Sequence, residues 1–297
     1  MFHYTNEKGL NGILKSKKLW LVSSLEMNDI TDRFYANLFV TTALLKCKDE
    51  DAVLLAKELT LEDILQVNIK SLEIPFYSAS FCERNDNDYL WIKYADGNKG
   101  VCIEINEDFF NEYKDKVVSE NYNSLEEDTP ENEIIIKKRR VEYGCPYNIF
   151  LDVLRLTKDF CINKPDGYRK EGFQNWLSLT LAILSGVIKS DNYSEEEEVR
   201  FLFQDRYNDE CVNQNCAYFL HKVELIKILK KLGVDKEIPG NGKRRMELNL
   251  EEIFNENLIK SITMGDEFSG SIEDLRKTMN ESGLSKVVLQ NRKGKVL

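Results

Sequence analysis

Four consecutive glutamates run directly into an apolar segment at Ser194–Phe203, SEEEEVRFLF. From Val199 to Phe203 every second residue faces the same way and is apolar, which is the period-2 pattern of a strand with one face in a core. By the same parity, Glu196 and Glu198 are expected to share a face with Arg200. A strand holds a carboxylate rigidly, and its field is strong in a partly dry cleft, so this position suits an electrostatic catalyst. The alternative is a solvated charge run that precedes a strand.

The composition predicts a globular protein without a strong attraction for polyanions. The chain has 297 residues, 42% of them hydrophobic and 10% aromatic, which is enough for a well-packed core. The formal charge of −10 repels nucleic acids and anionic membranes at long range. Two basic clusters, Lys137–Arg140 and Lys243–Arg245, are interpreted as ordinary solvated strand or loop faces.

Cysteine usage, the N-terminal sequence and the lack of a long apolar run favour a soluble cytoplasmic protein. The seven cysteines contain no CxxC pair, and several lie in apolar runs, so we expect reduced and mostly buried thiols. A structural motif begins within three residues of Met1, which leaves no room for a signal peptide. No apolar run approaches membrane-spanning length, and no membrane contact is expected.

Strand and helix patterns follow one another without a strict βαβ rhythm, which predicts an α+β fold in a single domain, residues 1–297. Apolar helical periodicity places a helical insertion at about residues 31–72, broken near Thr60. The expected strands are 1–5, 19–23, 75–82, 101–105, 134–143, 199–203, 244–248, 259–264 and 286–290. The other expected helices are 6–14, 89–95, 147–161, 172–189 and 271–282, with a mixed segment at 218–232 and loops at 120–133 and 238–243.

Several common catalytic sites are missing from the sequence. It has two histidines, His3 and His221, so HExxH zinc chemistry is excluded and no metal site is predicted. No glycine-rich phosphate loop, GxSxG elbow or kinase block is present. A cysteine nucleophile paired with His221 stays open as an alternative. Carboxylates, hydroxyls and aromatic rings remain, and they suit a reaction with a cationic transition state.

Three blocks of the chain together resemble a bacterial family called domain of unknown function 2971. They are HYTNEKGLNGILKSKKLWLVSSLEMND at 3–29, SFCERNDNDYLWIKYADGNKGVCIEI at 80–105 and IKSDNYSEEEEVRF at 188–201. With the closing 259–265 strand, the resemblance covers nearly the whole chain. The sequence departs from the family pattern at Lys17, where glycine is usual, at Cys82, where serine is usual, and near Tyr193, where tryptophan is usual.

The first block is also similar to the ADP-ribosyltransferases with a His-aromatic-Glu signature, which include the DarT-like toxins. In that group an H-x-T strand leads into a helix with an N-L-x-x-I-L rhythm, matched here by His3, Thr5, Gly9-Leu10 and Ile13-Leu14. This resemblance implies an ADP-ribosyltransferase-like mixed or antiparallel β core. It also implies an aromatic on the second strand, matched by Trp20, and a catalytic glutamate that opens a late strand.

The resemblance implies roles for individual residues toward NAD, the substrate whose nicotinamide–ribose bond would break. Glu198 is the expected catalyst, Glu196 orients the acceptor, and which carboxylate of Glu195–Glu198 acts stays open. His3 would bind the adenosine ribose and complete the catalytic set. The expected binding residues around it are the backbone of Tyr4 or Thr5 for the carboxamide, Trp20 and Tyr94 for the nicotinamide ring, and Arg84 for a phosphate. Asn28-Asp29 is first of all a turn former.

These features predict an NAD-dependent ADP-ribosyltransferase that modifies a macromolecule, protein or nucleic acid. By analogy it would be a toxin or an anti-phage defence effector, with an antitoxin or other neutralising protein as a possible partner. Two alternatives stay open. One is a non-catalytic sensor or interaction module of the same fold, and the other is a metal-dependent nuclease or nucleotide hydrolase that uses Glu196 and Glu198.

Overall fold

The computed structural model describes residues 1–24, 31–46, 60–73, 77–108, 134–144, 184–205, 236–237 and 244–297, with single positions between 174 and 182. The expected elements at 147–161, 218–232, 120–133 and 238–243, most of 172–189, and Asn28-Asp29 lie outside this part. So do five of the seven cysteines. The other two, Cys82 and Cys102, are buried free thiols, as expected.

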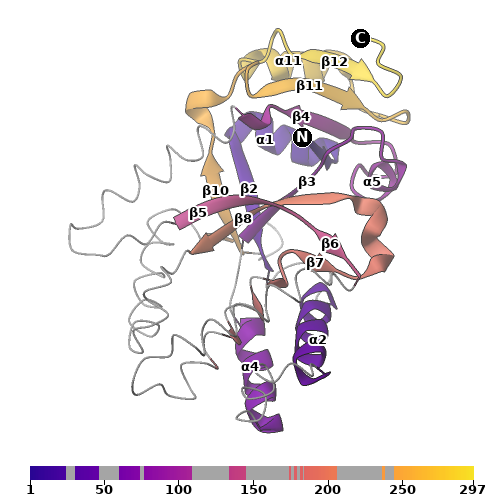
Figure 1. Ribbon diagram of the computed structural model, residues 1–297. Helices are drawn as coiled ribbons and strands as arrows, with labels where there is room; N and C mark the ends of the chain where they lie inside the picture. The colour runs from indigo at the N-terminus through magenta and orange to yellow at the C-terminus, as the bar shows by residue number, and fades with distance from the viewer. Residues whose placement is uncertain are drawn as a thin grey trace, which may run out of the picture.

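Most of the described strands form one sheet, drawn in Figure 1. Its strands are β1 (Phe2–Thr5), β2 (Lys18–Ser23), β3 (Tyr77–Cys82), β4 (Val101–Ile105), β5 (Ile134–Arg140), β8 (Glu198–Asp205), β9 (Lys236–Glu237), β10 (Arg244–Asn249), β11 (Ile259–Met264) and β12 (Val288–Asn291). The order is β12-β11-β4-β1-β3-β2-β10-β9, and β8 pairs with both β3 and β5. All pairs are antiparallel except β11 with β12. A mixed, mostly antiparallel sheet with helices confirms the α+β class.

Strand β3 is the branch point of the sheet. Along one edge it pairs with β8 from Tyr77 to Cys82. Because β8 occupies that whole edge, β1 and β2 share the other, β2 at Tyr77-Ser78 and β1 at Cys82. Strands β1 and β2 therefore pair with opposite ends of β3 on one edge, and β8 pairs along β3 from Tyr77 to Cys82 on the other edge.

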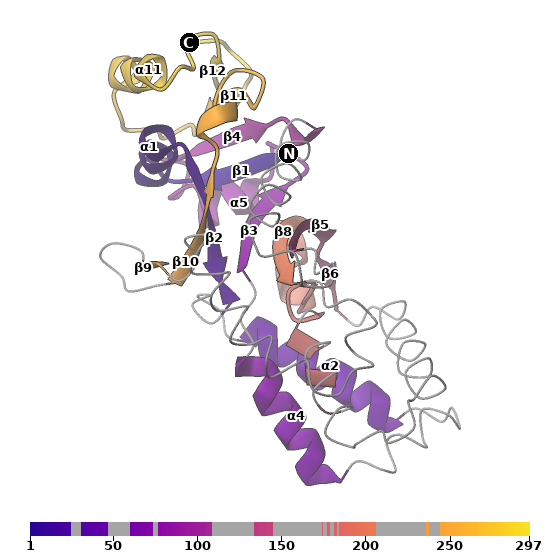
Figure 2. The same ribbon diagram turned by 90° about the vertical axis from the view of Figure 1, so that its left-hand side faces the viewer.

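The two faces of the sheet are covered by different helices. Helices α1 (Glu7–Ser16) and α11 (Ile272–Glu281) bury Leu10, Leu14, Leu275 and Met279 in the main core, and Figure 2 shows both helices on one side of the sheet. The opposite face carries the short helix α5 (Asp88–Lys93), whose Trp91 packs edge-on against Tyr4 with ring centroids 5.3 Å apart. Cys82 and Cys102 complete this second, smaller core.

The helical insertion appears as two antiparallel helices, α2 (Thr31–Lys46) and α4 (Leu61–Glu73). They lie at the end of the molecule opposite α11 and β12 (Figure 1). Asn37 donates to the Ser71 hydroxyl at 2.5 Å, and Arg33 donates to the Ser71 carbonyl oxygen at 2.8 Å. Thr60 caps α4, since its hydroxyl accepts from the Asp63 amide at 3.2 Å. The expected break near Thr60 is thus the start of a helix.

Local sequence signals account for most element boundaries. Asn6 caps α1 as expected, its side chain accepting from the Gly9 amide at 2.8 Å. Trp20 is 36% exposed while its neighbours Leu19 and Leu21 are buried, which confirms the predicted two faces of β2. The predicted cap of α5 at Asp86 or Asp88 is wrong, because the side chain between them, Asn87, accepts from the Leu90 amide at 3.1 Å.

The end of α1 places a lysine in a left-handed conformation. Lys17 is the C-cap residue and has φ 52° and ψ 37°. This left-handed conformation satisfies the Ile13 carbonyl through the Lys17 amide but crowds any Cβ.

We predict that Lys17→Gly raises the free energy of unfolding by about 0.5–1 kcal/mol, because glycine adopts this conformation without the Cβ penalty. Urea unfolding followed by circular dichroism measures the change. Lys15→Gly, an exposed position inside the last turn of α1, is the control and should lower stability by a similar amount. Equal destabilisation by both variants would contradict the prediction.

Candidate functional site

The acidic run divides between two elements rather than forming one strand. Residues Asp191–Glu196 form a 3₁₀ helix, η2, and Glu197 has a left-handed backbone with φ 45°. Strand β8 therefore begins at Glu198, the first carboxylate that follows the turn. The parity expectation for Glu196 is wrong, because Glu196 belongs to η2. The expectation that Glu198 and Arg200 share a face is confirmed by their contact.

Glu198 is a buried carboxylate held by two cations. Arg200 donates through Nε to Oε1 at 2.8 Å and through Nη2 to Oε2 at 3.0 Å, which is a two-pronged bond. The Lys189 ammonium lies 2.8 Å from Oε2. Burial by itself raises the pKa of Glu198, but Arg200 and Lys189 outweigh it and hold this pKa at about 2. Glu198 is therefore ionised throughout the physiological range.

Glu196 is equally enclosed, with an exposed fraction of 2%. Its Oε1 accepts from the Lys93 ammonium at 2.6 Å and from the Tyr94 hydroxyl at 2.9 Å. Its Oε2 accepts from the Lys189 ammonium at 2.7 Å. Lys189 thus contacts both carboxylates.

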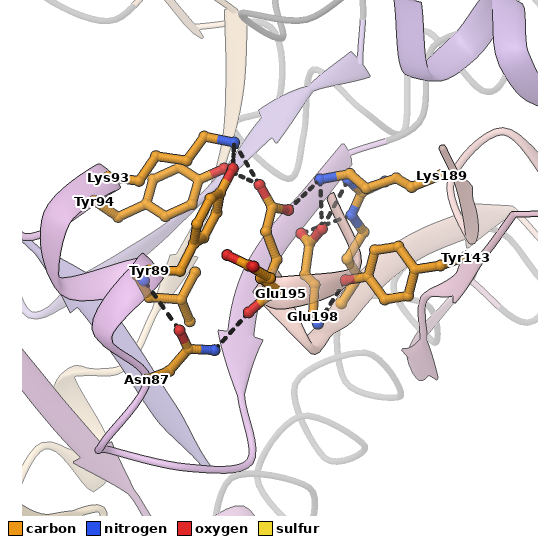
Figure 3. Close-up of polar contacts among 11 residues, drawn as sticks. Asn87, Tyr89, Lys93, Tyr94, Tyr143, Lys189, Glu195 and Glu198 are labelled. Atoms are coloured by element: carbon orange, nitrogen blue, oxygen red, sulfur yellow. Dashed lines mark hydrogen bonds and ion pairs between the residues drawn. The ribbon is translucent and has the colours of Figure 1, made fainter. Parts of the chain in front are cut away.

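The five charged side chains form one continuous chain of alternating sign, Lys93–Glu196–Lys189–Glu198–Arg200, hereafter the charge chain. Figure 3 shows Lys93 and Tyr94 approaching from α5 on one side and Lys189 on the other. Each carboxylate lies between two cations, so the ionised set carries a net charge of +1. Burying carboxylates in this way is tolerable only because every one of them is paired and hydrogen-bonded.

The solvent end of the charge chain is lined by tyrosines. The Lys93 ammonium lies 5.2 Å from the ring centroids of Tyr89 and Tyr94 and 4.7 Å from that of Tyr193. Its side chain is 35% exposed, whereas those of Lys189 and Arg200 are 7% and 3% exposed. A ligand from solvent would therefore meet Lys93 and Tyr94 first.

Backbone contacts fix the two elements that carry the carboxylates. The Asn87 amide group donates to the Glu195 carbonyl oxygen at 2.7 Å, which ties the start of α5 to η2. The Glu198 amide donates to the Tyr143 hydroxyl at 2.9 Å, and the Glu198 carbonyl accepts from the Val141 amide at 2.9 Å. Tyr143 belongs to β6 (Glu142–Tyr143), which pairs in parallel with β7 (Ile188–Lys189), the strand of Lys189.

Three of the predicted site residues, Tyr94, Glu196 and Glu198, lie together in the structure. Tyr94 donates to Glu196, and Glu196 and Glu198 share the cation Lys189. Trp20 lies on the same face of the sheet as Glu198. The strand register shows this, since Val22 pairs with Ser78, Cys82 pairs with Glu198, and residues two apart in a strand share a face. Arg84, predicted to bind a phosphate, forms an ion pair with Glu197 at 2.8 Å.

His3 lies on the opposite face of the sheet from Glu198. Its neighbour Phe2 pairs with Cys82, which in turn pairs with Glu198, so the next residue points the other way. The His3 ring lies 5.4 Å from that of Phe81, and its Nδ1–H donates to the Ser80 carbonyl at 2.9 Å. Burial lowers the pKa of His3 and favours the neutral ring.

The other site residues predicted on β1, Tyr4 and Thr5, make contacts that support the fold. The Tyr4 hydroxyl donates to the Arg84 carbonyl at 2.9 Å and accepts from the Asn87 amide at 3.3 Å, so it supports the loop before α5. Thr5 pairs with Val101 at the end of β1. Neither contact tests the predicted role of this backbone toward a carboxamide.

Sequence reasoning missed the cations Lys93 and Lys189 and the hydroxyl of Tyr143. A signal for two of them was present, because Lys93 lies in the 80–105 block and Lys189 in the 188–201 block. Like charges as close as Glu195–Glu198 require compensation wherever they are buried. That requirement could have directed the search to the basic residues of the same blocks.

Comparison with known proteins gives a family match over part of the chain. Residues 90–201 match the model of the family described as "Protein of unknown function (DUF2971)". This match supports the family resemblance, and the matched stretch contains the complete charge chain, from Lys93 to Arg200. No curated protein and no solved structure matches the chain.

No described helix has the length and apolar character needed to cross a membrane. Within the same described ranges, no group of three or more His, Cys, Asp or Glu side chains is arranged to hold a metal ion.

We predict that Glu198→Gln makes the stability of the protein less dependent on acid pH. The folded pKa is depressed from 4.5 to about 2, so Glu198 contributes stability that is complete above pH 4.5 and is lost as the pH falls toward 2. The contribution at neutral pH is about 3 kcal/mol. Urea unfolding at pH 7 should show the variant destabilised by about this amount, and the difference should shrink as the pH falls.

Glu195→Gln serves as the matched control, because Glu195 is exposed and contributes its carbonyl oxygen rather than its carboxylate to the site. It should follow the wild-type curve. A Glu198→Gln curve parallel to wild type from pH 7 to pH 2 would show that the ion pairs of Glu198 do not govern acid stability.

Proposed function

We propose that the protein is an NAD-dependent ADP-ribosyltransferase that modifies a macromolecule and that Glu198 is its electrostatic catalyst. One observation carries the proposal: a carboxylate that opens a strand is buried, fixed at both oxygens and kept ionised. A fixed carboxylate stabilises a developing cation better than mobile water does once part of its pairing with Arg200 and Lys189 is released. The resemblance to the His-aromatic-Glu transferases, with their ADP-ribosyltransferase-like β core, supplies the identity of the substrate.

Transfer of ADP-ribose from NAD requires a fixed negative charge near the ribose. Cleavage of the nicotinamide–ribose bond leaves positive charge on the ribose, as in glycoside cleavage, and a carboxylate that accepts from a ribose hydroxyl stabilises that charge. Glu198 Oε1 accepts from Arg200 Nε, whereas Oε2 accepts from Arg200 Nη2 and also contacts Lys189, so Oε1 is the oxygen better placed to accept a new donor. Arg200 keeps Glu198 ionised meanwhile, since it bonds both oxygens.

The proposal relies on residues of the Glu198 face. Trp20 and Tyr94 are 36% and 43% exposed there, and either ring presents an aromatic surface for nicotinamide. The Tyr94 hydroxyl contacts Glu196, the residue expected to orient the acceptor. His3 lies on the other face, so its role toward the adenosine ribose stays a prediction from the resemblance alone.

A second candidate, a non-catalytic sensor or interaction module, is favoured by a separate observation. Glu196 and Glu198 are only 2% and 5% exposed, and each of their oxygens already has a cationic partner. The charge chain would then be a structural support that fixes α5, η2 and β8. This reading and the transferase reading differ in whether NAD is consumed.

The cellular role follows by analogy only. Bacterial transferases of this kind are often toxins or anti-phage effectors, and a neutralising partner protein fits that role. The acidic net charge of −10 favours a protein acceptor. The DarT-like toxins that the first block resembles, by contrast, modify DNA.

We predict that incubation with radiolabelled NAD and cell lysate transfers label to a macromolecule and that Glu198→Gln lowers the rate by about two to three orders of magnitude. The substitution keeps the shape of the side chain and removes the charge that faces the ribosyl cation. Separate protease and nuclease digestion of the labelled fraction identifies the acceptor class. Glu195→Gln is the control and should label at the wild-type rate.

The assay is run at a temperature where both variants are folded by circular dichroism. Equal labelling by wild type and Glu198→Gln would remove Glu198 from the chemistry. No labelling by wild type would leave the interaction module ahead, and activity lost with EDTA and restored by Mg²⁺ would favour a metal-dependent hydrolase.

We also predict that the double variant Trp20→Ala with Tyr94→Ala binds NAD at least 10-fold more weakly, because two aromatic surfaces for the ring are lost. Both side chains are partly exposed, so the fold should survive. Isothermal titration calorimetry measures the affinity. Ile92→Ala is the control. Ile92 is an exposed apolar residue of α5, two residues before Tyr94, and this variant should bind NAD as wild type does. Unchanged affinity in the double variant would place the nicotinamide elsewhere.

A further inference from the structure

Lys189 is the central member of the charge chain. Its ammonium lies 2.7 Å from Glu196 Oε2 and 2.8 Å from Glu198 Oε2, and its side chain is 7% exposed. The backbone beneath it is fixed, since the Lys189 carbonyl accepts from the Gly144 amide at 2.9 Å. Figure 3 shows Lys189 directed at the carboxylates from the side opposite Lys93.

The other two cations each serve one carboxylate. Lys93 bonds Glu196, and Arg200 bonds Glu198. If Lys189 were removed, both carboxylates would keep one partner but would face each other across the gap that the ammonium now fills. Neighbouring carboxylates in a buried site repel each other, so with one cation fewer the pair takes up a proton more readily.

We infer that Lys189 is the positioning residue that holds Glu196 and Glu198 side by side as two ionised carboxylates. Its place in catalysis rests on the proposed function, because it would act on the reaction only through Glu198. This clamp, the Lys189 ammonium held between Glu196 and Glu198, is a property of the free protein and does not depend on NAD.

Among the described residues, the other groups with contacts to the pair or to Lys189 do not supply a second free cation. Tyr94 from α5 and Tyr143 from β6 are phenols and neutral at pH 7, and burial raises the pKa of Tyr143 further. The Tyr193 ring lies 5.6 Å from the Lys189 ammonium and carries no charge. Lys93 and Arg200 are already engaged. Loss of Lys189 therefore lowers the charge of the set from +1 to 0, and the other cations that contact the pair in the described part of the chain, Lys93 and Arg200, each already bond one carboxylate.

The test follows carboxyl titration by NMR in protein carrying ¹³C at the glutamate side-chain carboxyl carbon. Comparison with Glu196→Gln and Glu198→Gln assigns the two signals. In wild type we expect the Glu198 carboxyl to remain ionised at pH 5. In Lys189→Met we expect one proton to enter the pair with an apparent pKa raised by about 1–3 units. Lys189→Arg, which keeps the cation, should restore the wild-type titration.

Lys138→Met is the matched control. It removes a lysine that bonds both oxygens of Glu107 at 2.7 and 2.8 Å in a partly exposed pair away from the charge chain. The Glu196 and Glu198 signals should not move in this variant. Unchanged titration in Lys189→Met would overturn the inference, and so would a wild-type Glu198 signal that titrates above pH 5. The wild-type measurement decides the matter if Lys189→Met does not fold.

The pH dependence of NAD labelling separates this inference from the proposed function. If both hold, the acid limb of the labelling rate moves to higher pH in Lys189→Met and returns in Lys189→Arg. If NMR shows the shift and no labelling occurs in any variant, the clamp stands and the transferase proposal falls. Labelling with an unchanged NMR titration would leave the transferase and overturn the clamp.

Discussion

Two buried carboxylates, each of which needs cationic partners, set the main constraint on this structure. An isolated carboxylate inside a protein costs several kcal/mol, and a pair of them costs more unless cations meet both. Here the cations come from three elements: Lys93 from α5, Lys189 from β7 and Arg200 from β8. Lys93 and Glu196 are 103 residues apart in the chain. Their charges therefore require α5 to reach η2, however the intervening sequence is arranged.

The position of α5 is secured from several sides. Trp91 donates to the Asn85 carbonyl at 2.9 Å and packs against Tyr4 of β1. Arg292, which follows β12, lies 5.1 Å from the Trp91 ring, donates to Asn98 at 2.9 Å and forms an ion pair with Asp88. The C-terminal strands thus support the helix that carries Lys93. The geometry of the charge chain depends on residues near both ends of the protein.

Local sequence signals were enough to predict the elements but not their mutual placement. Period-2 alternation located β2, β4 and β11 within a residue of their bounds, and Asn6 and Ser271 marked helix starts, because these signals arise from contacts between residues a few positions apart. The pairing of Glu198 with Arg200 followed from strand parity for the same reason. The 3₁₀ turn that removes Glu196 from the strand depends on Glu197 adopting a left-handed conformation that its residue type does not announce.

The face on which a strand residue lies relative to distant strands was beyond prediction. The placement of His3 opposite Glu198 depends on the register of β1 against β3 and of β3 against β8, pairings between strands about 80 to 120 residues apart. A shift of one residue in either pairing would reverse it, since side chains alternate between faces. Neither the resemblance of the first block nor its spacing contains that register.

The compensation of Glu198 also bears on how it could act. A carboxylate neutralised by Arg200 and Lys189 presents little field to a neighbouring cation, so a catalytic Glu198 has to lose part of that compensation when substrate arrives. Arg200 is poorly suited to leave, because it bonds both oxygens and also the Gly186 carbonyl at 2.9 Å. Lys189 bonds Glu196 and Glu198 at nearly equal distances, so it can release Glu198 and still keep a carboxylate partner. Catalysis by Glu198 and its stability in the resting protein are therefore compatible only through the second carboxylate, Glu196.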